Sequence, residues 1–115
     1  MKFNNETIRN AVEEWLDNSK KAEVKYGHIS NWNVSNVNEF YRTFFNAPVF
    51  NQDLSNCNTS SATTLQGMFN GATIFNNGLT AGVSSTIMSW NTTNVTTIES
   101  TFASAPAFNG NISGC

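Results

Sequence analysis

The 115-residue chain carries a formal net charge of −2, and only 12% of its residues are charged. This length suits a single small domain, and the charge balance excludes a basic surface for nucleic acid. After Asp53 the only charged side chain is Glu99, so solubility depends on 19 Asn, 12 Ser and 13 Thr. Nine Phe and three Trp nevertheless predict a packed core rather than a disordered chain.

Residues 1–28 are predicted to form an N-terminal capping helix and a lead-in to the rest of the chain. The segment 6–18 reads ETIRNAVEEWLDN, and Asn5 is a candidate N-cap. Its apolar residues recur at helical spacing and form one stripe: Ile8, Val12, Trp15 and Leu16. We expect this stripe to cover the first coil of the repeats that follow.

From residue 29 onward the chain is a repeat. Residues 29–53 align with 54–78 at an offset of 25, and a third copy, 87–111, follows an insertion at 79–86. A fourth copy begins at 112–115. A period of this length is typical of solenoids in which each repeat makes one coil. The sequence therefore predicts a short solenoid of about three and a half coils.

Within each copy the spacing of the apolar residues changes halfway. Ile29, Trp32 and Val34 fit the strand part of a leucine-rich repeat, whereas the apolar residues of 37–44 have helical spacing. We expect the helix to end near Asn46 and its equivalents, at residues that tolerate left-handed geometry. The predicted fold is an α/β repeat that resembles a leucine-rich repeat, with short parallel strands on one face and short helices on the other.

The repeat also resembles a known family. The phrase ISNWNVSNV at 29–37, followed by Phe44, Ala47 and FNQD at 50–53, is similar to the DUF285, or BspA-like, repeats of roughly 25 residues. Such repeats are abundant in mycoplasma surface proteins and occur in other microbes and large DNA viruses. The resemblance covers 29–115. It implies a leucine-rich-repeat-like stack used for surface display, adhesion or assembly, with no catalytic residues to carry over.

The residue types that catalysis requires are sparse. His28 is the only histidine, Asp53 has no equivalent in the other copies, and no phosphate-binding or metal-binding motif is present. We therefore expect no enzyme activity, no catalytic residue, no cofactor and no metal.

The two cysteines close the same short phrase, FNQDLSNC at 50–57 and FNGNISGC at 108–115. In the alignment, Cys57 and Cys115 take the position of Trp32 and Trp90. That places them two coils, or roughly 10 Å, apart. A disulfide needs Cα atoms within about 7 Å, so we expect none between them.

We expect partner contacts at three places. The outward side chains of the predicted strands form a neutral, amide-rich face: Asn31, Asn33, Ser35, Asn56, Asn58, Ser60, Asn91 and Thr93. The insertion contributes Leu79 and Val83, because insertions in repeats map to loops on one face. The uncovered last coil contributes Ile112 and Cys115, and such an end exposes apolar side chains and unpaired backbone groups.

These features favour a non-enzymatic structural or protein-interaction module, a component of a larger surface or virion-type assembly. A protein partner is expected at the open C-terminal coil, where self-association is a second option. The alternative is an adhesin-like module that binds host glycan or protein. The first ten residues lack an apolar signal region and no stretch approaches 18 apolar residues. We therefore expect no membrane insertion, and favour a particle or cell-surface assembly over a free cytosolic protein.

Overall fold

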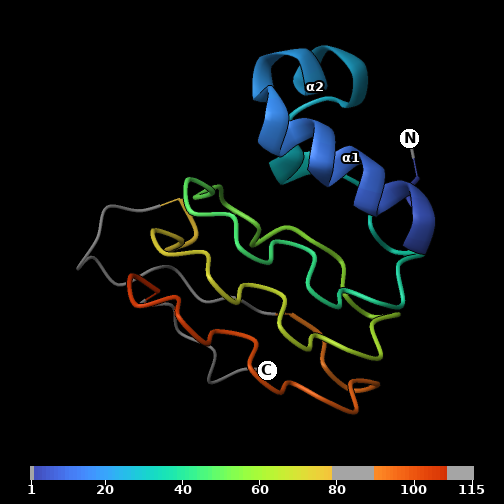
Figure 1. Cartoon of the computed structure of the whole chain (residues 1–115). Coiled ribbons are helices and arrows are strands. Elements are labelled where there is room, and N and C mark those ends of the chain that lie inside the picture. Colours follow the sequence, from blue (N-terminus) through green and yellow to red (C-terminus); the bar gives the residue numbers. More distant parts are fainter. Residues whose placement is uncertain (1, 79–89, 109–115) are drawn as a thin grey trace.

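The computed structural model describes residues 2–78 and 90–108. Two α-helices, α1 (Asn5–Asp17) and α2 (Ser19–Tyr26), are followed by the 3-10 helix η1 (Ile29–Asn31). Below the helices, three turn-rich segments run side by side (Figure 1). Among the described residues, no helix is of the length and apolarity that crossing a membrane requires.

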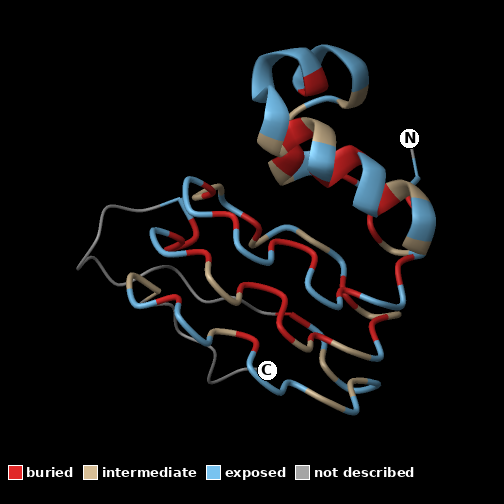
Figure 2. Cartoon of the chain, in the orientation of Figure 1, coloured by how far each residue is buried: buried red, intermediate tan, exposed pale blue. Residues whose placement is uncertain are grey.

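Helix α1 begins with a capping box. The side chain of Asn4 accepts hydrogen bonds from the N–H groups of Glu6 and Thr7, and the Asn4 N–H donates to the Thr7 hydroxyl at 2.9 Å. Asn4, rather than the expected Asn5, is therefore the cap. The helix buries Ile8, Val12 and Trp15 of the predicted stripe, adds Ala11, and leaves the predicted Leu16 half-buried. Figure 2 shows this buried face turned toward the turn-rich segments.

The turn-rich segments are stacked layers, which we call layer 1 (29–53), layer 2 (54–78) and layer 3 (90–108). In each of the first two layers, every second N–H of one stretch donates to a carbonyl of the next layer. In layer 1 the donors are Phe40, Arg42, Phe44 and Asn46, at 2.7–3.1 Å from the carbonyls of Thr64, Gln66, Met68 and Asn70. In layer 2 they are Leu65, Gly67, Phe69 and Gly71, at 2.8–3.1 Å from Thr97, Glu99, Thr101 and Ala103.

The intervening N–H groups close tight turns within their own layer. In layer 1 the Thr43 N–H donates to the Phe40 carbonyl at 3.2 Å, and the Phe45 N–H donates to the Arg42 carbonyl at 3.1 Å. The same two positions of every layer are left-handed, with φ between 51° and 81°: Arg42, Asn46, Gly67, Gly71, Ser100 and Ser104. Position 71 requires glycine for space as well, because a Cβ there would lie 3.1 Å from the Asn46 Cα.

The predicted α/β solenoid of parallel strands and helices is therefore wrong. In the described residues the helices all lie before residue 32, and there is no β-strand, only isolated parallel bridges at Lys2–Asn33, Glu39–Thr64 and Thr64–Thr97. A left-handed residue ends any helix that starts near residue 37, and alternate N–H groups bond to the next layer instead of the preceding turn. Because the other N–H groups close turns, no two successive residues pair as a strand either.

Two columns of nearly parallel phenylalanine rings hold the layers together. One column contains Phe44, Phe69 and Phe102, with ring centroids 5.5 and 5.4 Å apart. The other contains Phe50, Phe75 and Phe108, at 5.8 and 5.6 Å. Within each layer the two rings stack at 4.1 Å. The stacked rings therefore supply hydrophobic contact between successive layers.

Helix α1 closes the upper side of layer 1 with two side chains one turn apart. The Asn5 carboxamide oxygen accepts from the N–H groups of Asn38 and Glu39, at 2.7 and 3.1 Å. The Arg9 guanidinium donates to the Tyr41 carbonyl at 2.6 Å. The Asn38 N–H and the Tyr41 carbonyl have equivalents in layer 2, at Thr63 and Gln66, that bond to another layer.

The left-handed geometry makes a prediction at two adjacent exposed residues. Replacing Ser104 (φ 54°) with glycine removes left-handed strain, so it should raise the free energy of unfolding by about 0.5–1 kcal/mol. The matched control is Ala103→Gly, which should lower the free energy of unfolding by about 0.5–1 kcal/mol. At this position glycine relieves no left-handed strain and only increases the conformational entropy of the unfolded chain. Urea unfolding measures both. Equal destabilisation by the two changes would contradict the left-handed assignment.

Candidate interaction edge on the third layer

Layer 3 ends the described stack with four backbone N–H groups that continue the ladder pattern. We call them the donor row: the N–H groups of Ile98, Ser100, Phe102 and Ser104. Their equivalents in layers 1 and 2 all donate to a following layer. Within the described part of the chain, the donor row has no hydrogen-bond acceptor.

The donor row is also the positive end of aligned peptide dipoles. In each layer, four peptide groups direct the carbonyl toward α1 and the N–H away from it, and these groups stack through three layers. Aligned peptides of about 3.5 D each give a helix its macrodipole, and the same addition applies here. At the carbonyl end, which is negative, the Arg9 guanidinium donates to the Tyr41 carbonyl, as expected for a cation. The N–H end favours acceptors.

Apolar side chains accompany the donor row. Ile98 is 65% exposed, whereas its equivalents Phe40 and Leu65 are 3% and 5% exposed. Phe102 and Phe108 are half-buried, although their equivalents in layer 2 are fully buried. The edge of layer 3 therefore combines uncovered apolar surface with unpaired donors, the combination by which sheet edges recruit another chain.

The amide-rich face predicted from the sequence is largely satisfied by its own turns. The carboxamide oxygens of Asn33, Asn58 and Asn91 accept from the N–H group two residues on, at 3.0–3.2 Å, which defines Asx turns. These three asparagines are exposed, as are Asn31 and Asn56 beside them. The oxygens of the three, however, already accept hydrogen bonds within their own turns. The structure brings the set together in three layers: Asn31, Asn33, Ser35, Asn56, Asn58, Ser60, Asn91 and Thr93.

The other predicted contact residues lie outside the described part of the chain. They are Leu79, Val83, Ile112 and Cys115. The described residues place an open edge on layer 3 itself, at positions that the sequence analysis treated as helix.

An exposed aromatic and cationic cluster on layer 1 was not expected from the sequence. The Arg42 guanidinium lies 4.5 Å from the Phe45 ring centroid and 5.3 Å from that of Tyr41. Both rings are exposed, and the equivalent positions in layers 2 and 3 hold no aromatic residue. Tyr and Arg are typical of binding hot spots, so this cluster is a second candidate contact surface.

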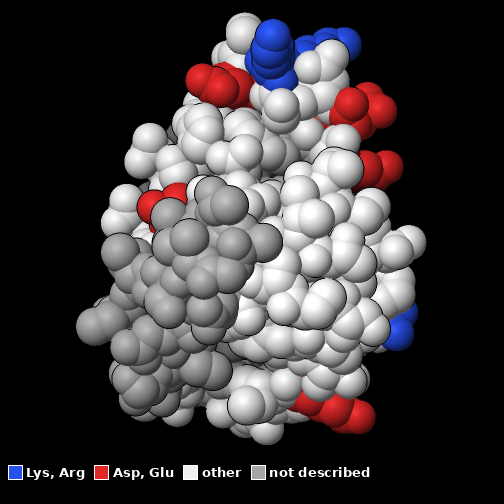
Figure 3. All heavy atoms as spheres, turned by 90° about the vertical axis from the view of Figure 1, so that its left-hand side faces the viewer, with Lys and Arg blue, Asp and Glu red and all other residues white. Residues whose placement is uncertain are grey.

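Elsewhere, the charged groups gather on the helices and the layers are largely uncharged (Figure 3).

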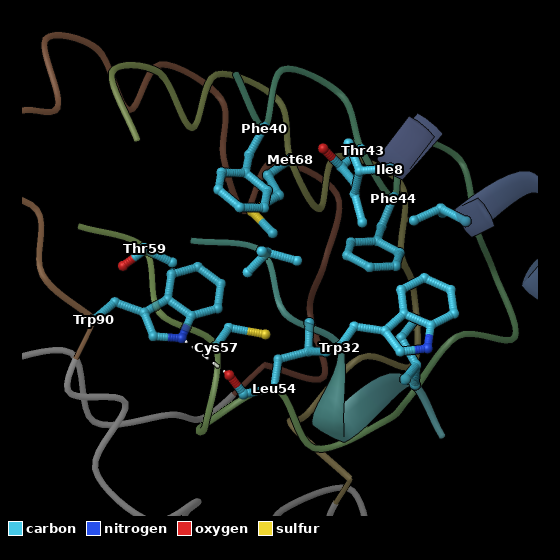
Figure 4. A pocket seen from close by; sticks show the side chains of 13 residues that line it. Ile8, Trp32, Phe40, Thr43, Phe44, Leu54, Cys57, Thr59, Met68 and Trp90 are labelled. Carbon is cyan, nitrogen blue, oxygen red and sulfur yellow. Dashed lines mark hydrogen bonds between the residues drawn. The ribbon is translucent and has the colours of Figure 1, made fainter. Parts of the chain in front are cut away.

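A small apolar cavity lies inside the stack, where Cys57 stands in place of a tryptophan. Its volume is about 20 Å³, room for about one water, and the Cys57 sulfur lies between Trp32 and Trp90 (Figure 4). The Trp90 indole N–H donates to the Leu54 carbonyl at 3.0 Å. Burial, followed by the charge of Asp53, raises the pKa of the Cys57 thiol to about 12. Cys57 is therefore a neutral packing residue rather than a nucleophile.

The remaining titratable groups serve local structure. The His28 Nδ1 accepts from the Ser30 N–H at 3.2 Å, and the ring stands edge-on to Trp15. The Tyr26 hydroxyl and then the Lys25 ammonium lower the pKa of the Glu14 carboxyl by hydrogen bonding. Among the described residues, no three His, Cys, Asp or Glu side chains gather in a way that could hold a metal ion.

The Cys57 thiol gives a prediction that can be measured in a Cys115→Ser background. At pH 8.5 an exposed thiol is about half ionised, whereas a thiol with a pKa of about 12 is almost wholly protonated. Reaction with a thiol reagent should be at least about a hundredfold slower in the folded chain than in denaturant. Equal rates in the two states would contradict the raised pKa of this half-buried thiol.

The same pKa fixes the sign of the pH dependence. The unfolded thiol ionises near pH 8.5 and the folded thiol does not, so its contribution to stability is complete below pH 8.5. That contribution should fall as pH rises toward 12. A Cys57→Ala, Cys115→Ser chain is the control, since it should lack this part of the decline.

Comparison with known proteins gave one match. A family model described as "Mycoplasma protein of unknown function, DUF285" matches residues 8–115. No curated protein and no solved structure matched the sequence. The match confirms the resemblance in the repeats and extends it to most of α1.

Proposed function

Because the chain belongs to the DUF285 family, whose function is unknown, we propose from its geometry that it is a non-enzymatic structural module that binds a protein partner at layer 3. The observation that carries the proposal is the edge of layer 3. Its donor row lacks acceptors in the described chain, and Ile98 is 65% exposed beside it. A second polypeptide would satisfy both the backbone and the apolar surface.

The chemistry of the described residues supports a role without catalysis. The apolar cavity beside Cys57 is of water size, and burial keeps the Cys57 thiol protonated. His28 contacts Ser30 and Trp15 rather than a carboxylate that could orient it as a base. Binding, rather than turnover, is the role we propose for this fold.

A larger surface or virion-type assembly is the setting that we propose for this binding. The layers have few charges, and their polar surface consists of Asn, Ser and Thr side chains engaged in turns. A surface of this kind gains little from long-range electrostatic steering and suits a fixed place in an assembly. Backbone hydrogen bonds and stacked rings would supply the affinity.

Binding of a host glycan or protein, as in an adhesin, is the second candidate function. The exposed cluster of Tyr41, Arg42 and Phe45 favours it, because aromatic faces and guanidinium groups bind sugars and proteins. In that case Arg42→Ala would abolish binding of the isolated protein to glycans or cells, and changes on layer 3 would leave that binding intact.

Photo-crosslinking in the native source tests the proposed function. A benzophenone amino acid replaces Ile98 on the edge, and in the control it replaces Val24, which is 90% exposed on α2. The Ile98 position should give one crosslinked partner in a fixed ratio, and the Val24 position should not. Absence of a crosslink from Ile98, or the same products from both positions, would contradict docking at layer 3.

A further inference from the structure

We infer that the partner docked at layer 3 is a polypeptide segment of another molecule that adds one more layer of this same repeat. This inference rests on the proposed function and specifies its ligand. The polarity of the edge determines which ligand it can bind. In an ordinary strand edge, N–H and C=O groups alternate along one side. From Ile98 to Ser104 this edge presents donors only.

The single polarity follows from the ladder. The carbonyls that alternate with the donor row belong to Thr97, Glu99, Thr101 and Ala103, and all four accept hydrogen bonds from layer 2. Between Ile98 and Ser104 the open side is a row of N–H groups at two-residue spacing. Just before this row the polarity is reversed, because the Thr63 N–H donates to the Asn38 carbonyl and the Thr96 N–H donates to the Thr63 carbonyl. The ligand of the row must therefore present acceptors at the same spacing, and a row of carbonyls from a turn-rich layer does so.

A second copy of the chain does not meet this requirement. Two layer-3 edges facing each other would set donors against donors. The acceptor side of layer 1 lies under α1, where Arg9 occupies the Tyr41 carbonyl. Ile8 and Val12 of the helix line the same cavity as Thr43 and Phe44 of layer 1. A head-to-tail pair would therefore have to displace the helix.

Layers 2 and 3 show what the incoming segment must contain. Opposite the four ladder N–H groups of layer 1 and of layer 2, the following layer presents four carbonyls. The following layer also stacks a phenylalanine ring on each ring of its neighbour and has a small residue between its own two rings. All three layers share one pattern: apolar-x-x-x-Phe-x-x-Ala-x-x-Phe, at 40–50, 65–75 and 98–108. A segment with this pattern would cover Ile98 and stack on Phe102 and Phe108.

The segment that we propose belongs to a partner that carries this same repeat. The molecule that supplies this segment has a layer that is not covered by a helix like α1. The association is therefore directional: a capped chain receives a layer and cannot donate its own.

The test uses the intact, isotopically labelled chain and a synthetic peptide of residues 54–78, with serine at the Cys57 position to prevent disulfides. The amide protons of Ile98, Ser100, Phe102 and Ser104 should shift downfield. Their hydrogen exchange should slow about tenfold at a peptide concentration of ten times Kd. The matched control peptide carries Phe69→Ala and Phe75→Ala, which removes the stacking rings, and it should bind at least tenfold more weakly.

A second experiment reduces the entropy cost of ordering and binding a free peptide. The same 54–78 segment is joined after Cys115 through a flexible Gly/Ser linker, so that its effective concentration reaches about millimolar. The four amides should then be protected within one chain. Equal effects of both peptides, or failure of both experiments to protect the donor row, would overturn the inference.

Two results separate this inference from the proposed function. A partner that crosslinks to Ile98 while the repeat segment leaves the donor row unprotected would keep the function and overturn its ligand. Sedimentation of the free chain supplies the other result, for which we expect a monomer. A dimer that Ile98→Asp abolishes, with an unchanged amide spectrum elsewhere, would show that a second copy is the ligand instead.

Discussion

The direction of the backbone hydrogen bonds between layers is the constraint on which this structure depends. In each layer, four peptide groups point their carbonyls toward α1 and their N–H groups away from it, so the stack has a polarity. Because buried backbone groups must be paired, each layer requires a neighbour on both sides. On the α1 side of layer 1, Arg9 donates to the Tyr41 carbonyl and the Asn5 carboxamide oxygen accepts from the Asn38 N–H. At layer 3 the requirement is not met within the described chain, and that is where we place the partner.

The same constraint accounts for the unusual composition of the layers. Threonine hydroxyls reinforce the ladder, since Thr63 donates to the Asn38 carbonyl at 3.2 Å and Thr96 donates to the Thr63 carbonyl at 3.1 Å. Asparagines close Asx turns and supply left-handed residues such as Asn46. Charged side chains are few in the layers, and one of them, Asp53, closes a turn of the same kind by accepting from the Ser55 N–H at 2.9 Å. The Asn, Ser and Thr content that resembles a disordered chain therefore serves as hydrogen-bonding structure.

The sequence could predict which residues are equivalent but not the backbone that joins them. The offset of 25 and the repeated Phe–x–x–Ala–x–x–Phe identify the ring columns, and the stripe from Ile8 to Trp15 identifies α1. The spacing of Val37, Phe40 and Phe44 predicts a helix. Two consecutive tight turns also separate apolar residues by three or four positions, so the spacing alone cannot distinguish the two structures. Left-handed geometry decides between these structures. Glycine signals it only in layer 2, whereas Arg42 and Ser100 give no such signal. The polarity of the edge could not be predicted without that geometry.

Residue-resolved amide hydrogen exchange of the free chain tests the central claim most directly. The account predicts strong protection of the eight ladder donors in layers 1 and 2, from Phe40 to Asn46 and from Leu65 to Gly71 at alternate positions. It predicts near-intrinsic exchange for Ile98, Ser100, Phe102 and Ser104, whose residues occupy the same positions in layer 3. Protection of all twelve amides alike in the monomer, or of odd-numbered rather than even-numbered amides in layer 1, would contradict it.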